Sequence, residues 1–358
     1  MKIGILTWHQ AINHGAVLQT YASCKMLEKL GETPIVLEYD RVMDEKIHKG
    51  KRLIRRIKNF SPAKLLWYRN VKRIYKTKSY NFARFRQDYL PLGKKYNEEK
   101  NIDIVYIGSD MVFDISQGYN EFMYGIGVPC QNIFSYAASF GYSTLQSIKQ
   151  SGHFNEIRDG ISKFKAIGYR DENTRLICNE LVQNIALVET IDPVLCYGFE
   201  KEYNEWDSKK WKNKKYLLVY AYDSTMNDSE TVKVIREYAN NNGLEIVSCG
   251  YYHKWCDICV PASPIELIEL FKYASCIITD TFHGTVFSAL FHKQFVSIIR
   301  NNGFKVKHLL EQTQLERRIV TNKDLVDILA EEIDYSFFDE WIASQRNKSY
   351  EFIESNMR

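Results

Sequence analysis

Strand-like apolar runs alternate with helix-like segments twice along this chain, and this alternation constrains the fold more than any other feature. The first series has runs rich in β-branched and aromatic residues at 3–6, 34–39, 102–107, 132–137, 166–169 and 185–188. The second series has runs at 216–222, 244–248, 276–279 and 295–299. Strands that alternate with helices form parallel sheets covered by helices on both faces. The sequence therefore predicts an α/β fold with two domains in tandem.

The domain boundaries follow from where this pattern stops and restarts. The first series ends near Asp192 and Pro193, and a stretch rich in charged and aromatic residues precedes the second series. A chain of 358 residues also exceeds what one hydrophobic core usually supports. The predicted organisation is an N-terminal α/β domain at 1–197, a linker at 198–215, a C-terminal α/β domain at 216–334, and a C-terminal helix at 335–358 that could cross back to the first domain.

The net charge of +4 hides a strongly basic segment. Residues 41–86 contain 16 Lys and Arg against two acidic residues, which gives +14 here and leaves −10 for the rest of the chain. Basic residues alternate with apolar and aromatic ones at near-helical spacing, as in helices that bind membrane surfaces. The segment is predicted to be a basic helical insertion in the N-terminal domain, and it either contacts a membrane peripherally or packs on its own domain. We expect no nucleic-acid binding, because no recognised binding motif accompanies the charge.

The sequence favours a cytoplasmic location, with peripheral contact at the inner face of the membrane as an open alternative. It opens with a strand-like segment, shows no signal peptide, and has no apolar run near the roughly 18 residues that span a bilayer. Its eight cysteines are scattered, which predicts reduced thiols. Cys256 and Cys259 form one C-x-x-C pair without a second pair at matching spacing, so no metal site is predicted.

Polar residues and glycines follow five of the predicted strands. In doubly wound sheets, ligands bind beyond the carboxyl ends of the strands, so these residues are the candidates for a site. Asn13 and Asp171 have an alternative explanation as helix caps. The candidates are His9, Asn13, Gly15, Ser109, Asp110, Ser139, Arg170, Asp280, Thr281, His283, Gly284 and Thr285.

The stretch TDTFHGTVFSALF at 279–291 carries the densest group of these candidates. It joins a strand to a helix through a polar turn, and a helix N-terminus in that position favours an anionic ligand. The alternative is structural, with Asp280 or Thr281 capping the helix and His283 as an ordinary turn residue. This stretch alone does not decide between the two interpretations.

Taken in order, the motifs resemble those of the polysaccharide pyruvyl transferase family. They are MKIGILTWHQAINHGAVLQTYA, IGSDMVF, SYAASFG, YRDENT, DPVL and ITDTFHGTVFSALFHKQFV, spread over about residues 1–300. Each motif is weak alone, and the ordered set is specific. The resemblance implies two Rossmann-like domains arranged as in the GT-B glycosyltransferases, in agreement with the two predicted α/β domains.

The resemblance also implies an activity. A pyruvyl group would pass from phosphoenolpyruvate to two hydroxyls of a sugar in the precursor of a cell-surface glycan, such as an exopolysaccharide or capsule. The products would be a cyclic ketal and phosphate. Phosphoenolpyruvate is then the donor substrate, and no cofactor is expected. Whether the glycan acceptor is lipid-linked stays open.

This chemistry assigns roles to the candidate residues. The phosphate and carboxylate of the donor require cations and helix N-termini, and the forked guanidinium of Arg170 suits them. A proton must be moved during ketal formation, which suits His283, with Asp280 orienting its imidazole or capping the helix. The other candidates are predicted to bind substrate.

The chain departs from the family pattern at one position that matters. Members often have Arg-x-His where this chain has Thr281, Phe282 and His283, so one expected cation is missing. Arg300 and Lys305 are candidate replacements. Two other functions stay open: a GT-B glycosyltransferase that uses a nucleotide sugar, and a non-catalytic adaptor that binds glycans or membranes through its basic segment.

Overall fold

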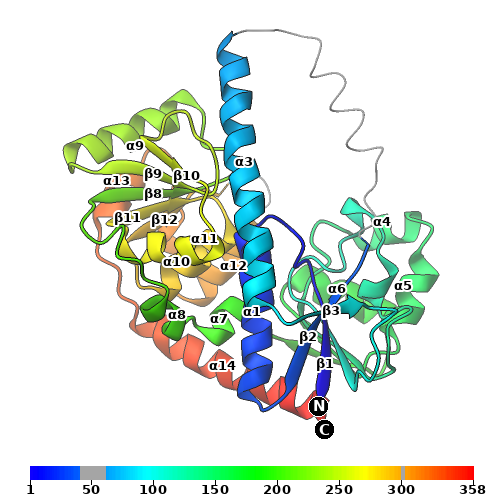
Figure 1. Cartoon of the computed structure of the whole chain (residues 1–358). Coiled ribbons are helices and arrows are strands. Elements are labelled where there is room, and N and C mark those ends of the chain that lie inside the picture. Colours follow the sequence, from blue (N-terminus) through cyan, green and yellow to red (C-terminus); the bar gives the residue numbers. More distant parts are fainter. Residues whose placement is uncertain (41–61, 300–302) are drawn as a thin grey trace. The chain divides into compact units, whose positions relative to one another are not determined.

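The computed structural model describes residues 1–40, 62–299 and 303–358 (Figure 1). The chain divides into two compact units. The N-terminal unit consists of Met1–Phe60, Arg86–Tyr197 and Ser344–Arg358, and the C-terminal unit consists of Ser61–Phe85 and Gly198–Ala343. Each unit contains one parallel sheet, as the alternating pattern predicts.

The sheet of the N-terminal unit has the strand order β3-β2-β1-β4-β5-β6-β7, and every neighbouring pair is parallel. Every residue of β4 and β5 is buried, as expected of central strands between two helical layers. The strands are β1 Lys2–Leu6, β2 Thr33–Glu38, β3 Leu92–Lys95, β4 Ile104–Ile107, β5 Ile133–Ala138, β6 Ala166–Tyr169 and β7 Ala186–Glu189.

Helices connect these strands. Among the described helices that lie wholly within the unit, the longest is α1, which follows β1 and is buried along most of its length. The helical segments are α1 His14–Lys29, η1 Ile115–Gln117, η2 Glu121–Tyr124, α4 Leu145–Gln150, α5 Phe154–Ile161, α6 Glu172–Leu181 and α7 Pro193–Tyr197. Asn13 and Asp171 cap α1 and α6 through their side chains, so their capping interpretation is confirmed.

The sheet of the C-terminal unit has the order β10-β9-β8-β11-β12 and is also parallel throughout. Its strands are β8 Tyr216–Tyr220, β9 Glu245–Cys249, β10 Ile258–Val260, β11 Cys276–Thr279 and β12 Phe295–Ser297. Its helical segments are α8 Glu200–Glu205, α9 Ser229–Asn241, α10 Pro264–Tyr273, α11 Phe282–Leu290, α12 Phe304–Gln312, η3 Glu316–Arg318 and α13 Leu325–Ala330.

Two long helices have residues in both units. Helix α3 (Pro62–Tyr89, light blue in Figure 1) lies mainly in the C-terminal unit, and α14 (Ser336–Met357) has most of its residues in the N-terminal unit. Among the residues with described structure, no helix has both the length and the hydrophobicity that crossing a membrane requires.

The division differs from the predicted boundaries in two places. The predicted linker at 198–215 contains α8 and belongs to the C-terminal unit, because its aromatic side chains pack there: Tyr203, for example, contacts Phe291 with ring centroids 4.7 Å apart. The described part of the basic insertion, from residue 62 to 85, is helical as predicted but clusters with the C-terminal unit. The rest of the insertion, 41–61, lies outside the described residues.

Candidate functional site

The strand orders locate the point in each sheet where ligands are expected. The order reverses direction between β1 and β4 in the N-terminal unit and between β8 and β11 in the C-terminal unit. At such switch points the helices that follow neighbouring strands lie on opposite faces, which leaves a crevice beyond the carboxyl ends. The candidate residues follow β1, β4, β5 and β6 in the first sheet and β11 in the second.

The segment after β1 is held by His9 and ends at the cap of α1. His9 is fully buried, with Nδ1 3.2 Å from the Thr7 carbonyl oxygen and Nε2 3.4 Å from a carboxylate oxygen of Glu38. The hydrogen bond with His9 lowers the pKa of Glu38, against the opposing effect of burial. His9 therefore orders the loop from within, while Asn13 accepts a hydrogen bond from the backbone N–H of Ala16 at 3.3 Å and Gly15 is buried in the first turn.

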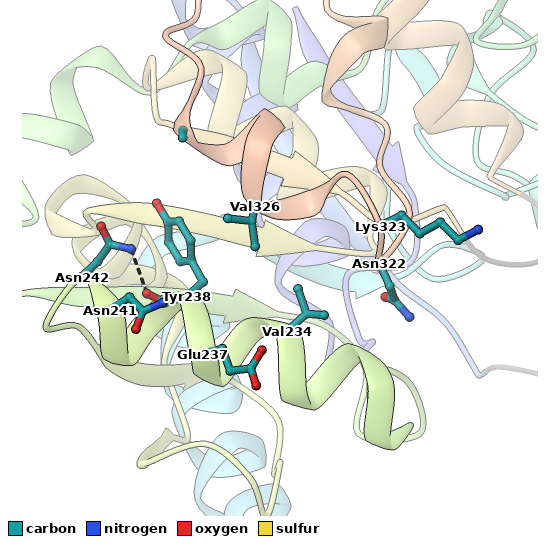
Figure 2. Close-up of a pocket in the computed structure, with 9 residues that line it drawn as sticks. Val234, Glu237, Tyr238, Asn241, Asn242, Asn322, Lys323 and Val326 are labelled. Atoms are coloured by element: carbon teal, nitrogen blue, oxygen red, sulfur yellow. Dashed lines mark hydrogen bonds between the residues drawn. The ribbon is translucent and has the colours of Figure 1, made fainter.

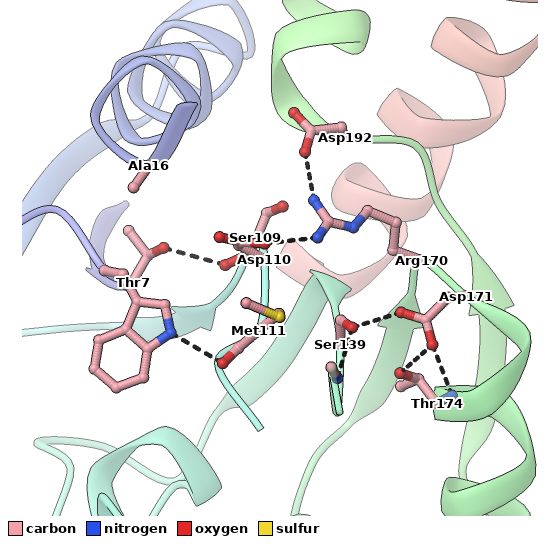
Figure 3. Close-up of polar contacts among 12 residues, drawn as sticks. Thr7, Ala16, Ser109, Asp110, Met111, Ser139, Arg170, Asp171, Thr174 and Asp192 are labelled. Atoms are coloured by element: carbon pink, nitrogen blue, oxygen red, sulfur yellow. Dashed lines mark hydrogen bonds and ion pairs between the residues drawn. The ribbon is translucent and has the colours of Figure 1, made fainter. Parts of the chain in front are cut away.

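Arg170 joins two carboxylates at the carboxyl ends of the N-terminal sheet (Figure 3). Its Nη1 lies 2.6 Å from Asp192 and its Nη2 lies 2.7 Å from Asp110. The side chain of Asp192 is fully buried, whereas that of Asp110 is 23% exposed. Burial acts to lower the pKa of Arg170, but the charges of Asp110 and Asp192 outweigh it and the net shift is upward. Both ends of the fork thus bind protein carboxylates.

Asp110 and Ser109 follow β4 in an unusual backbone conformation. Asp110 has φ 73°, a left-handed value that is uncommon outside glycine. Ser109 is fully buried, and its carbonyl oxygen accepts a hydrogen bond from the Thr7 hydroxyl at 3.3 Å. The turn requires glycine just before it, because a Cβ at Gly108 would lie 2.1 Å from the carbonyl oxygen of Tyr136. Such local constraints are typical of residues that must present a side chain in one direction.

Ser139, after β5, connects the sheet to the start of α6. Its hydroxyl donates a hydrogen bond to Asp171, and it accepts one from the backbone N–H of Gly141 at 2.9 Å. Asp171 also accepts hydrogen bonds from the backbone N–H and hydroxyl of Thr174, at 2.9 and 2.8 Å. Together, Ser109, Asp110, Ser139, Arg170 and Asp192 form what we call the N-terminal cluster.

In the C-terminal unit, α11 begins directly after β11, at Phe282. Thr281 is its N-cap, because the Thr281 hydroxyl accepts a hydrogen bond from the backbone N–H of Gly284 at 2.9 Å. The helix therefore starts at Phe282, and of the two residues considered as caps, Thr281 is the one. Asp280 is not the cap.

Hydroxyl groups hold the start of α11 rigidly. Thr279 Oγ1 donates to the carbonyl oxygen of Tyr220 at 2.7 Å, and Thr285 Oγ1 lies 2.8 Å from Ser297 Oγ. A Cβ at Gly284 would lie 2.0 Å from Thr279 Oγ1, so only glycine allows this close approach. Asp280 and His283 are half-buried beside this framework, and the ring of His283 contacts that of Phe282 edge to face at 5.3 Å. We call residues 279–285 the C-terminal cluster.

Each predicted site residue thus lies beyond the carboxyl end of a strand, either in one of the two clusters or in the segment from His9 to the first turn of α1. Asp192 was missed as a site residue, although it is the Asp of the DPVL motif that follows β7. Of the two candidate replacements for the missing cation, Lys305 lies in the first turn of α12 and Arg300 lies outside the described residues.

A separate surface pocket contains none of these residues (Figure 2). It has a volume of about 460 Å³, and its walls come from α9 and from residues in and before α13. The lining residues are Val234, Glu237, Tyr238, Asn241, Asn242, Asn322, Lys323, Val326 and Ala330. None of its lining residues belongs to the N-terminal or C-terminal cluster, and we do not assign the reaction to it.

Solved structures with a similar fold include several nucleotide-sugar enzymes. UDP-GlcNAc 2-epimerase of Neisseria meningitidis, bound to UDP-GlcNAc, has 10% identity and a TM-score of 0.50, with 100% of this chain and 99% of that chain covered. MnaA of S. aureus with UDP has 14% identity and a TM-score of 0.50, covering 97% and 90%. UDP-GlcNAc 2-epimerase of Methanocaldococcus jannaschii has 10% identity and a TM-score of 0.51, covering 98% and 100%. At such identities the likeness shows the fold alone: two Rossmann-like domains of the GT-B type.

Sequence comparison identifies the family. No significant match was found among curated proteins. The family model for polysaccharide pyruvyl transferase matches residues 13–302, which is most of the chain and includes the N-terminal and C-terminal clusters. The chain therefore belongs to the polysaccharide pyruvyl transferase family, whose members are transferases that act on polysaccharides.

Proposed function

We propose that this protein transfers a pyruvyl group from phosphoenolpyruvate to two hydroxyls of a sugar in the precursor of a cell-surface glycan. The observation that carries the proposal is the family match over residues 13–302. The start of α11 supports it, because a helix N-terminus at the carboxyl end of a parallel strand favours an anionic ligand. Phosphoenolpyruvate carries two anionic groups, and it serves as donor without a further cofactor.

The reaction breaks one bond to phosphate, forms two bonds to sugar oxygens and moves two hydroxyl protons. One sugar hydroxyl adds to C2 of phosphoenolpyruvate, and C3 takes up a proton to become a methyl group. The bond from C2 to the phosphate oxygen breaks, and phosphate leaves with the electron pair. The second hydroxyl then adds to C2 and closes the ketal. The two sugar hydroxyls lose two protons. One is accounted for by the proton that C3 takes up, and the other leaves with phosphate.

His283 is the residue that we propose moves a proton in these steps. Imidazole takes up and releases protons near neutral pH, which suits both the hydroxyl and the methylene carbon. His283 is in the first turn of α11 and is half-buried, so the helix fixes its position. Asp280, just before the cap, is proposed to orient the imidazole.

The N-terminal cluster is proposed to contact substrate through Asp110. Arg170 pairs with the fully buried Asp192 and holds the Asp110 carboxylate in place. The side chain of Asp110 is 23% exposed. A carboxylate suits a sugar hydroxyl, from which it accepts a hydrogen bond. Arg170 then acts as a positioning residue, since both ends of its fork already bind carboxylates.

Helix α3 supports peripheral contact with the inner face of a membrane, where a lipid-linked acceptor would be found. Its large apolar side chains Leu65, Leu66, Tyr68, Tyr75 and Tyr80 are 55% to 67% exposed. The exposed basic residues on the same helix include Arg69, Lys72, Arg73 and Lys76. Exposed aromatic residues beside positive charge are typical of segments that bind anionic lipid headgroups.

Replacing Lys72, Arg73 and Lys76 by Gln is expected to weaken binding to phosphatidylserine vesicles by at least about tenfold, since each basic residue near such a surface contributes about 1 kcal/mol. Vesicle sedimentation measures this effect. The matched control replaces three exposed lysines of the same unit, Lys201, Lys212 and Lys233, and is expected to bind as the unmodified protein does. Equal losses in both variants would show that α3 is not the contact surface.

The identity of the donor distinguishes the proposed function from its alternative. A GT-B glycosyltransferase would bind a nucleotide sugar, whereas a pyruvyltransferase must bind phosphoenolpyruvate. We expect the full chain to bind phosphoenolpyruvate in preference to UDP-GlcNAc. A protein that binds the nucleotide sugar and not phosphoenolpyruvate would favour the alternative function.

A further inference from the structure

Lys78 is a buried lysine within the stripe of α3 that packs on the C-terminal unit. Ile74, Lys78, Phe82 and Phe85 recur at helical spacing and are 6%, 2%, 0% and 3% exposed. Lysine is almost never fully buried unless it is paired, because removing its charge from water is costly. An apolar residue would fill this position at lower free energy, so the lysine requires a specific explanation.

The surroundings of Lys78 stabilise its charge only in part. Nζ lies 3.9 Å from the ring centroid of Tyr251 and 5.4 Å from that of Phe82, and such cation–π contacts partly replace water. Within the described parts of the chain, Lys78 forms no ion pair. Burial lowers the pKa of Lys78 to about 8, and the interactions with Cys249 and Asp223 oppose this shift without cancelling it.

The contacts of α3 place Lys78 at the carboxyl ends of the C-terminal sheet. Asn70 Nδ2 donates to the hydroxyl of Tyr252 at 3.0 Å, just after β9, and Asn81 Nδ2 donates to the carbonyl oxygen of Pro261 at 2.9 Å, just after β10. Lys78 lies between these two anchors in the helix. It therefore faces the end of the sheet at which ligands bind in this architecture.

Tyr251 links Lys78 to the C-terminal cluster. Its ring contacts that of Tyr220, the last residue of β8, with centroids 6.4 Å apart. The backbone of Tyr220 is bonded in turn to Thr279, beside the cap of α11. The charge of Asp280 also contributes to the raised pKa of Tyr251, after the larger effects of burial, Tyr222, Asp223 and Cys249. A buried cation and a helix N-terminus thus belong to the same edge of one sheet.

We propose that Lys78 binds the anionic donor in the C-terminal unit, where it supplies the cation that the segment around Thr281 lacks. The identification of the donor as phosphoenolpyruvate rests on the proposed function, whereas the existence of an anion site at Lys78 does not. A phosphate or carboxylate at this edge would give the Lys78 ammonium the ionic partner that the described residues do not. Helix α3 then has two proposed roles. Its exposed face contacts the membrane surface, and Lys78 on its buried face binds the ligand.

The first test measures binding of phosphoenolpyruvate to the full chain by calorimetry. Replacing Lys78 by Met keeps the length and apolar stem of the side chain, and is expected to weaken binding by about 10- to 100-fold, the loss of one charge-assisted contact. Lys212→Met, an exposed lysine of the same unit, is the matched control and is expected to leave binding unchanged. Equal affinity in the Lys78→Met variant would overturn the proposal.

A second readout separates donor binding from a structural role. Because the ammonium becomes neutral as pH rises through about 8, affinity for phosphoenolpyruvate is expected to fall over that range in the unmodified protein and to stay level in Lys78→Met. Burial disfavours the charged lysine, so the unfolded state binds more protons between pH 8 and its ordinary pKa of 10.5, and stability rises with pH there. Lys78→Met is therefore expected to melt at the same or a higher temperature at pH 7. A lower melting temperature with parallel pH profiles would assign Lys78 a purely structural role.

Inorganic phosphate separates failure of this inference from failure of the proposed function. If phosphoenolpyruvate does not bind, but phosphate raises the melting temperature of the unmodified protein and not that of Lys78→Met, the anion site stands and the donor assignment is wrong. If neither anion has a Lys78-dependent effect, the anion site itself is refuted.

Discussion

Replacing His283 by Ala is expected to lower turnover by roughly 10²–10⁴-fold, the usual contribution of a positioned acid–base group. Turnover is measured as phosphate released from phosphoenolpyruvate in the presence of a glycan acceptor, per folded molecule. Binding of phosphoenolpyruvate should fall far less, because the N-terminus of α11 and its Thr281 cap remain. Asp280→Asn is expected to be milder, since it keeps the shape of the side chain.

The matched control for this variant is His292→Ala. His292 follows α11 in the same unit, but its side chain is 49% exposed and pairs with Asp339 at the surface, 2.8 Å away. It is expected to keep normal turnover. If the His283→Ala protein is folded and also keeps near-normal turnover, the histidine has no catalytic role and the stretch is a structural turn.

Replacing Arg170 by Met is expected to destabilise the protein by about 3–5 kcal/mol, because it leaves a buried carboxylate without its partner. The side chain of Asp192 is fully buried and lies 2.6 Å from Arg170, so it has no access to water as compensation. Denaturant unfolding monitored by tryptophan fluorescence measures the change. This expectation replaces the simpler one that Arg170 binds the donor.

Two further variants test this interpretation of Arg170. Arg175→Met removes an exposed pair with Glu172, with side chains 39% and 60% exposed, and is expected to cost less than about 1 kcal/mol. Adding Asp192→Asn to Arg170→Met should restore part of the lost stability, since the unpaired charge is then gone. A small loss in Arg170→Met, together with weaker donor binding, would return Arg170 to the ligand site.

The sequence predicts the interior of both sheets and the edge strands β7 and β12, and it misses the edge strands β3 and β10. Central strands such as β4 and β5 are continuous apolar runs, because they are buried on both faces. The edge strand β3, with the sequence LGKK, has no such run, and β10 is only three residues long. Edge strands are short and polar because exposed apolar edges promote aggregation, and this weakens their signal.

The sequence also locates the candidate site while leaving its contacts undetermined. Residues at strand ends can be found from the alternation of strands and helices alone. The pairing of Arg170 with Asp192 cannot be found in this way, because the contact depends on how β6 and the segment after β7 lie side by side. The sequence also does not decide whether Asp280 or Thr281 caps α11. The Thr281 hydroxyl accepts a hydrogen bond from the backbone N–H of Gly284, which makes Phe282 and His283 the first residues of the helix.

Lys78 shows both the limit of sequence reasoning and the signal that was available. Among 16 basic residues at 41–86, charge alone does not distinguish it. Its spacing from Ile74, Phe82 and Phe85 does, because the four share one buried face of the helix, whereas Lys72, Arg73 and Lys76 are exposed. A lysine within an apolar stripe is the pattern to look for. Which unit covers that stripe depends on contacts such as that of Asn81 with Pro261, 180 residues away.

The measurement that tests the central claim most directly is donor selection by thermal shift. A ligand that binds only the folded state stabilises it by about 2.7 kcal/mol at a concentration 100 times its Kd, so a true donor raises the melting temperature in a concentration-dependent way. The account predicts a rise with phosphoenolpyruvate and none with UDP-GlcNAc at the same concentration. A rise with UDP-GlcNAc alone would contradict it, and would make this member of the family a nucleotide-sugar enzyme.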